Sequence, residues 1–87
     1  MRVTVISPDA AVFDGDADSV VAPAIDGSVG ILTGHAPLMT MLGSGTLVVR
    51  TDGVVREFRV QGGFLQVVKD TVRILAERID RGTDGTR

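Results

Sequence analysis

The sequence contains no cysteine, tryptophan or tyrosine, and it has a single histidine, His35. Without cysteine, neither disulfides nor thiol chemistry can hold the fold together. Three phenylalanines are the only aromatic residues, so the chain has no stacking platform for sugars or single-stranded nucleic acid. No apolar run approaches the roughly 20 residues of a membrane-spanning helix, and we therefore expect no direct membrane insertion.

Charge and length set further bounds. A net charge of −2 over 87 residues is too small to indicate a nucleic-acid partner. Residues 1–43 carry one arginine against five aspartates, and residues 44–87 carry eight basic and six acidic residues. The two polar faces of a sheet would produce this asymmetry without any function, and we prefer this explanation to electrostatic steering of a partner. The 44% hydrophobic content predicts one folded domain with a modest core, because a chain of this size buries only about 60–65% of its unfolded surface.

Short alternating segments separated by turn residues fill the chain, and no segment keeps a 3.6-residue period. This pattern predicts an all-β fold, a small β-sandwich or flattened barrel of about 8–10 short strands. The domain is expected to span residues 1–80, followed by a flexible polar tail at 81–87. Strands are predicted at 2–6, 11–15, 18–22, 46–50, 54–60, 64–68 and 71–76, while 39–42 is ambiguous between strand and turn.

Glycine, proline and aspartate mark the corners. Asp26-Gly27 and Asp52-Gly53 predict hairpins, and Lys69-Asp70 predicts a third. Pro23 is expected to stop the third strand, and Gly62-Gly63 to form a bulge or a tight corner.

Alternation along the later strands predicts which side chains face the core. The charged residues that alternate with the core positions should face water: Arg50, Glu57, Arg59 and Arg73. Three apolar residues should face away from the core: Ile6, Val48 and Leu75. A cluster of apolar residues on an outer face would mark a docking surface. The residues expected to point inward are Leu47, Val49, Val54, Phe58, Val60, Val72 and Ile74.

The segment Gly30–Leu38 concentrates backbone constraints around His35 and reads as a rigid presented loop. His35 lacks the further ligands of a metal site and the nucleophile and orienting carboxylate of a catalytic one. Gly30 and Gly34 are not followed by the Lys-Ser/Thr of a phosphate-binding loop. We therefore predict no catalytic residue, no metal and no cofactor.

Five segments follow one another along the chain: Val3–Pro8, Val12–Gly15, Gly30–Leu38, Gly62-Gly63-Phe64 and Val72–Glu77. Together they resemble the N-terminal β-sandwich domain of the ε subunit of bacterial F-type ATP synthase. The run Gly-His-Ala-Pro-Leu, together with Gly-Gly-Phe and a closing Leu-Ala-Glu, is a fairly specific combination. One departure is Thr33, where the family usually has proline.

The resemblance implies a non-catalytic rotor component of the F1 sector, peripheral at the cytoplasmic face of the membrane. Its implied partners are the γ subunit, whose foot it clamps, and the polar loops of the c-ring, so that proton-driven rotation is coupled to ATP synthesis. By position, Ser7, His35 and Thr40 are implied to face γ, and Asp26, Gly27 and Ser28 to form the loop facing the c-ring.

The family usually continues with a two-helix domain that restrains ATP hydrolysis, and we expect this domain to be missing here. Ile79-Asp80 resembles the start of an ATP-binding motif of some members, but Thr83-Asp84 stand where that motif has Arg-Ala. The resemblance therefore implies neither the helical brake nor the nucleotide site. The rival hypothesis is a free-standing β-sandwich that binds a small ligand at the Gly30–Leu38 edge.

Overall fold

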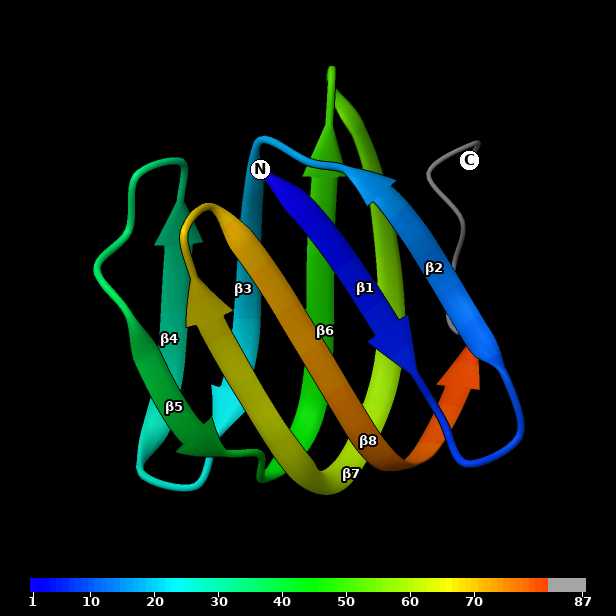
Figure 1. The fold of residues 1–87 in the computed structure, drawn as a ribbon. Helices are drawn as coiled ribbons and strands as arrows, with labels where there is room; N and C mark the ends of the chain where they lie inside the picture. The colour runs from blue at the N-terminus through cyan, green and yellow to red at the C-terminus, as the bar shows by residue number, and fades with distance from the viewer. Residues whose placement is uncertain (82–87) are drawn as a thin grey trace.

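A computed structural model describes residues 1–81, all of whose regular structure is β. The eight strands are β1 (Arg2–Ile6), β2 (Ala11–Asp16), β3 (Ser19–Ala24), β4 (Gly27–Leu32), β5 (Leu38–Met41), β6 (Ser44–Thr51), β7 (Val54–Val68) and β8 (Thr71–Arg81) (Figure 1). The predicted all-β fold is confirmed. Apart from Arg81, which ends β8, the predicted tail lies outside the described residues.

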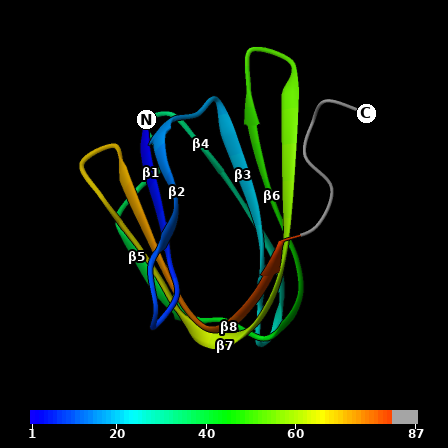
Figure 2. The ribbon, with the colours of Figure 1, turned by 90° about the vertical axis from the view of Figure 1, so that its right-hand side faces the viewer.

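One continuous sheet with the strand order β2-β1-β8-β7-β6-β3-β4 folds over to make two layers. The strands β5 and β6 pair with the same edge of β7, β6 with residues 54–61 and β5 with residues 64–67. Layer one consists of β2, β1, the first half of β8, the second half of β7, and β5. Layer two consists of β4, β3, β6, the first half of β7 and the end of β8. Figure 2 shows the two layers meeting where β7 and β8 bend.

The bend in β7 lies at Gly62 and Gly63, which have φ angles of 70° and 111°. A Cβ on Gly63 would overlap the carbonyl oxygen of Leu75 on the neighbouring strand, so the corner requires glycine. The register with β8 is the same on both sides of the bend, from Gln61↔Arg78 to Gly63↔Ala76. Of the two predicted alternatives, the structure therefore has the corner. It joins two predicted strands into one of 15 residues.

The core lies between the layers and consists of sixteen buried apolar residues. Among the described residues, no buried side chain is polar or charged. Six of the seven residues predicted to point inward are buried: Leu47, Val49, Phe58, Val60, Val72 and Ile74. The four charged residues predicted to face water are exposed.

Val54 is the exception, because its side chain is 40% exposed. It lies on the core side of β7, but next to the turn of a hairpin that projects past the opposite layer (Figures 1 and 2). Two residues further along, Arg56 stacks over the ring of Phe13, 5.4 Å from its centroid, at the mouth of the sandwich. Val54 lies beyond this stack, where it lines a surface hollow together with Phe13 and Asp52 and stays partly open to solvent.

The predicted hairpins are present, with two corrections to their details. Asp52-Gly53 and Lys69-Asp70 form two-residue turns with φ angles of 50°, 80°, 47° and 62°, as type I′ turns require. The tip of the β3–β4 hairpin is Ile25-Asp26, so Gly27 opens β4 instead of lying in the turn. Pro23 does not stop β3: it still pairs with Ser28, and its carbonyl oxygen accepts the N–H of Gly43.

Candidate functional site

Ser7 lies directly after β1 and shapes the turn into β2. Its N–H donates to the carbonyl oxygen of Ala10 at 2.9 Å, and its hydroxyl accepts the N–H of Ala10 at 3.3 Å. The hydroxyl also donates to the same carbonyl at 3.1 Å. The side chain is half-buried and borders two surface hollows. Ser7 thus fixes one end of layer one.

His35 lies in the β4–β5 loop at the other end of layer one. Its backbone N–H donates to the carbonyl oxygen of Leu32 at 3.0 Å, and its ring Nδ1 is 2.6 Å from the carbonyl oxygen of Ala36. Because a carbonyl oxygen only accepts, this contact is a hydrogen bond in the form of the ring that carries a proton on Nδ1. The preceding Gly34, with φ of 85°, donates its N–H to Asp70 Oδ1 at 2.9 Å. The loop is therefore fixed both from within and from the β7–β8 turn.

Thr40 lies in β5 and pairs with the buried Leu65 of β7. Its side chain therefore points to the core side and is half-buried. The residues that β5 presents outward are its neighbours Met39 and Met41, which are 63% and 60% exposed. Sequence reasoning missed both methionines, because 39–42 was ambiguous between strand and turn.

The residues of the predicted c-ring loop lie together. Asp26, Gly27 and Ser28 are exposed at the β3–β4 hairpin and the start of β4. Ile25 beside them is 64% exposed, and its N–H donates to the carbonyl oxygen of Met41 at 3.1 Å. This hydrogen bond places the hairpin next to the C-terminal end of β5.

The structure does not gather Ser7, His35 and Thr40 into one cluster. Asp70 in the β7–β8 turn accepts two hydrogen bonds, one from the N–H of Gly34 in the loop of His35 and one from the N–H of Arg2 at the start of β1. The loop of His35 therefore lies near the start of β1. Ser7 follows the far end of β1, and five residues of strand span roughly 17 Å. A partner that touches both Ser7 and His35 must therefore extend along layer one.

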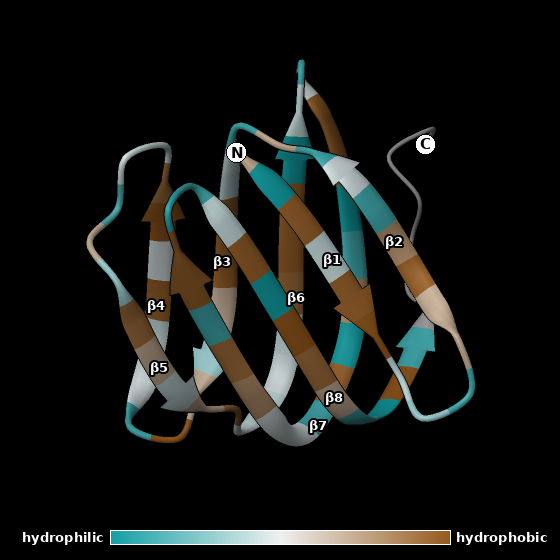
Figure 3. Ribbon diagram, viewed as in Figure 1, coloured by the Kyte–Doolittle hydropathy of each residue, from teal (hydrophilic) through white to brown (hydrophobic). Residues whose placement is uncertain are grey.

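The outer face of layer one carries a row of apolar side chains, which we call the apolar row: Met41, Phe64, Leu75 and Ile6. The strand registers place them side by side, with Met41 opposite Phe64, Phe64 opposite Leu75, and Leu75 opposite Ile6. The first three are 60%, 42% and 39% exposed, and Ile6 is half-buried. Figure 3 shows the hydrophobic stretches of these neighbouring strands. The expectation that Ile6 and Leu75 face away from the core is confirmed.

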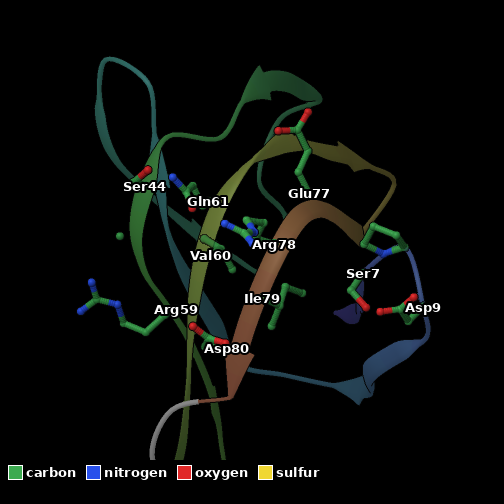
Figure 4. Close-up of a pocket in the computed structure, with 12 residues that line it drawn as sticks. Ser7, Asp9, Ser44, Arg59, Val60, Gln61, Glu77, Arg78, Ile79 and Asp80 are labelled. Carbon is green, nitrogen blue, oxygen red and sulfur yellow. The ribbon is translucent and has the colours of Figure 1, made fainter.

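Two hollows border this face. The apolar hollow, about 280 Å³, is lined by Met41, Phe64 and Leu75 of the apolar row with Gly63, Ala76, Glu77, Ser7 and Pro8. The polar cleft, about 590 Å³, carries charges of both signs, with Arg59 and Arg78 near Glu77 and Asp80. Figure 4 shows Ser7 and Asp9 on one side of this cleft and Ser44 and Gln61 on the other.

Two features are absent from the part of the chain that the structure describes. Between residues 1 and 81, no three histidine, cysteine or acidic residues lie close enough to hold a metal ion. The same residues contain no helix with the length and hydropathy needed to cross a membrane.

A β-sandwich with fixed corners carries an apolar row on one outer face, and a contiguous apolar surface of this kind is typical of protein–protein contacts. Comparison with known sequences identifies the family. The family described as "ATP synthase, Delta/Epsilon chain, beta-sandwich domain" matches residues 1–82. The chain belongs to this family.

Relatives named ATP synthase epsilon chain occur in several bacteria. The chain is 44% identical over 82 residues to that of Synechococcus sp. strain JA-2-3B'a(2-13) and 45% identical over 84 residues to that of Nostoc sp. PCC 7120. Each match covers 94% of this chain, but the chain spans only 60% and 61% of these two relatives. It is 46% identical over 78 residues to the Frankia casuarinae protein, covering 88% of this chain and 92% of that one.

Solved structures share the fold at low identity. A chain of the Euglena gracilis mitochondrial ATP synthase, solved with OSCP, F1 and c-ring, superposes with a TM-score of 0.85 at 22% identity, covering 91% of this chain and 51% of that chain. A chain from the central stalk and c-ring of the Tetrahymena thermophila enzyme gives 0.79 at 21% identity, covering 93% and 66%. At these identities the likeness shows a common fold.

Proposed function

We propose that this chain is a non-catalytic central-stalk subunit of an F-type ATP synthase. It clamps the foot of the γ subunit to the c-ring, so that proton-driven rotation is coupled to ATP synthesis. The observation that carries the proposal is the family match over residues 1–82, together with relatives named ATP synthase epsilon chain. The structural neighbours come from assemblies that contain F1, the central stalk or the c-ring.

The physical requirement for this role is a stiff body between two partners. Torque that bends the coupling element is not transmitted, so loops and corners must resist deformation. The corner at Gly63 has no room for another side chain. Loops that are distant in sequence are also bonded to each other, Gly34 to Asp70 at 2.9 Å and Asp52 to Asp18 at 2.8 Å. These features support a rigid coupling domain.

The proposed contacts follow the family positions. Ser7 and His35 lie at the two ends of layer one, Thr40 lies within it on β5, and all three are assigned to the γ side. Asp26, Gly27 and Ser28 are assigned to the polar loops of the c-ring, and their exposure at a hairpin tip suits a contact between polar loops. The chain would then lie in the F1 sector, peripheral to the membrane on its cytoplasmic face.

Recovery of the complex from membranes tests this assignment. A tagged copy of the chain, expressed in its own organism and purified after mild detergent extraction, is expected to bring down γ and the c subunit. Mass spectrometry of the eluate is the readout, and an untagged strain is the control. Recovery of neither γ nor the c subunit would contradict the proposed function.

The rival ligand-binding function requires a deep apolar pocket with a few convergent polar groups. The polar cleft is instead lined largely by polar and charged residues, and the apolar hollow lies on the outer face. A thermal-shift screen of small ligands separates the two functions, because a ligand-binding module gains stability on binding and a rotor clamp does not.

A further inference from the structure

The loop between β4 and β5, residues 33–37, has few connections to the rest of the molecule. It is closed from within by the hydrogen bond from the backbone N–H of His35 to Leu32 at 3.0 Å. Among the described residues, one hydrogen bond joins the loop to a segment outside β4 and β5: Gly34 donates its N–H to Asp70 Oδ1 at 2.9 Å. The place of the loop in space therefore depends on one side chain of the β7–β8 turn (Figure 1).

We infer that Asp70 is a positioning residue for the γ-type partner, an inference that rests on the proposed assignment of His35 to the γ side. Asp70 does not itself touch the partner. It acts through Gly34 and holds the loop of His35 in the conformation that the partner meets. The family positions do not include Asp70, and 36 residues separate it from Gly34.

The β7–β8 turn holds the carboxylate of Asp70 in a defined place. Lys69 and Asp70 have φ angles of 47° and 62°, as the tight type I′ turn requires. The carbonyl oxygen of Asp70 also accepts the N–H of Arg2 at 3.0 Å, which fixes the turn to the start of β1. The hydrogen bond to Gly34 has an ionised acceptor, and such bonds are stronger than neutral ones. The turn is thus a firm support for the loop.

The loop needs such a support because its own residues restrain it little. Gly34 has a φ of 85°, with open space around its would-be Cβ, and glycine leaves its backbone many conformations. Residues 33–37 are exposed except for His35, which is half-buried. A loop that samples several conformations binds its partner with an affinity reduced by the fraction that is competent. The hydrogen bond to Asp70 raises that fraction.

The β6–β7 hairpin supplies a matched control within the same chain. Asp52 lies in a two-residue turn of the same type, is exposed, and has a φ of 50°. Its backbone N–H donates to Asp18 Oδ2 at 2.8 Å, but its own carboxylate accepts no hydrogen bond from the described residues. Asp52→Ala therefore places alanine at positive φ, as Asp70→Ala does, without releasing a loop.

The test measures the affinity of the chain for the γ-type subunit of the same organism, at a temperature where thermal unfolding shows every variant to be folded. Asp70→Ala should lower the affinity about five- to tenfold, through loss of the hydrogen bond that fixes the loop. Asp70→Asn keeps an oxygen acceptor and should stay within about twofold of the unchanged chain. Asp52→Ala should also stay within about twofold.

A double-mutant cycle shows whether Asp70 acts through the loop. In a chain that already carries His35→Ala, the contact that the loop positions is lost. Asp70→Ala should then lower the affinity by no more than about twofold further. A residue that only stabilised the fold would cause the same loss of affinity in both backgrounds.

Each outcome separates the role of Asp70 from the proposed function. If the unchanged chain does not bind γ, the proposed function itself fails. If it binds γ and Asp70→Ala binds as tightly as Asp52→Ala, the function stands and Asp70 does not position the loop. Asp70→Asn as weak as Asp70→Ala, or an undiminished loss in the His35→Ala background, would also overturn the inference.

Discussion

Asp70 shows how much of this fold a single residue can hold. Its carboxylate accepts the N–H of Gly34, its carbonyl oxygen accepts the N–H of Arg2, and its backbone has a φ of 62°. The residue therefore connects the β7–β8 turn to the loop of His35 and to the start of β1. Aspartate and asparagine tolerate this left-handed conformation better than most residues with a side chain.

Removing the carboxylate should loosen these connections. Asp70→Ala loses the hydrogen bond to Gly34 and places alanine at positive φ, so we expect the free energy of unfolding to fall by about 1–2 kcal/mol. Urea denaturation gives this value, and amide exchange at Gly34 should accelerate. Asp70→Asn keeps an oxygen acceptor and the backbone preference, and should stay within about 0.5 kcal/mol. Equal losses in the two variants would show that the hydrogen bond does not stabilise the loop.

At the scale of elements, β7 and β8 determine the shape of the molecule. Each strand contributes to both layers, and β7 pairs with β6 in its first half and β5 in its second. The corner between the halves depends on Gly63, since a Cβ there would overlap backbone that is itself hydrogen-bonded in the sheet. No repacking of side chains can relieve such an overlap.

Alanine substitutions distinguish this corner from an ordinary strand glycine. Gly63→Ala should cost at least about 3 kcal/mol, through the overlap and the φ of 111°. Gly30→Ala in β4 is the control, because open space surrounds its would-be Cβ, and it should change stability by no more than about 0.5 kcal/mol. Chemical denaturation of both variants is the measurement. If Gly63→Ala is as stable as Gly30→Ala, the corner does not need glycine.

The sequence predicts local features of these elements better than their extent. The hairpin turns at Asp52-Gly53 and Lys69-Asp70 are predicted correctly, because the residues of a two-residue turn determine its backbone conformation. The alternation of apolar residues also assigns Phe58 and Ile74 to the core correctly. It fails at Val54, because alternation tells which face a residue takes but not where the opposite layer ends. The glycines at 62 and 63 predict a break between two strands, but the structure has one strand there. Local sequence does not show that pairing with β8 continues across the corner.

The candidate surface was predictable only in part. Ile6 and Leu75 were expected to face away from the core, and their outward position follows from alternation alone. Their alignment with Phe64 and Met41 depends on strand registers that connect segments up to 69 residues apart. No local pattern contains that information. The assignment of Ser7, His35 and Thr40 came from resemblance, and it stays a prediction.

For the whole molecule, the balance between core and surface suggests a protein that works in contact with others. Sixteen buried apolar residues form the core, while Met39, Met41, Phe64 and Leu75 remain on one outer face. A small domain gains stability when a permanent partner covers such a face. Met41, at the C-terminal end of β5, lies next to the exposed β3–β4 hairpin, so adjacent parts of one rigid body could hold two partners.

The absence of cysteine makes the most direct test simple, because each introduced cysteine is unique in the chain. Phe64→Cys, Ser28→Cys and Val21→Cys place one thiol on the outer face of layer one, at the hairpin tip and on the outer face of layer two. Each variant is assembled in membranes and treated with a short thiol-directed cross-linker, and the products are identified by mass spectrometry. The account predicts γ adducts from Phe64→Cys, c-subunit adducts from Ser28→Cys and neither from Val21→Cys. Adducts of γ or c from Val21→Cys, with none from the other two variants, would contradict it.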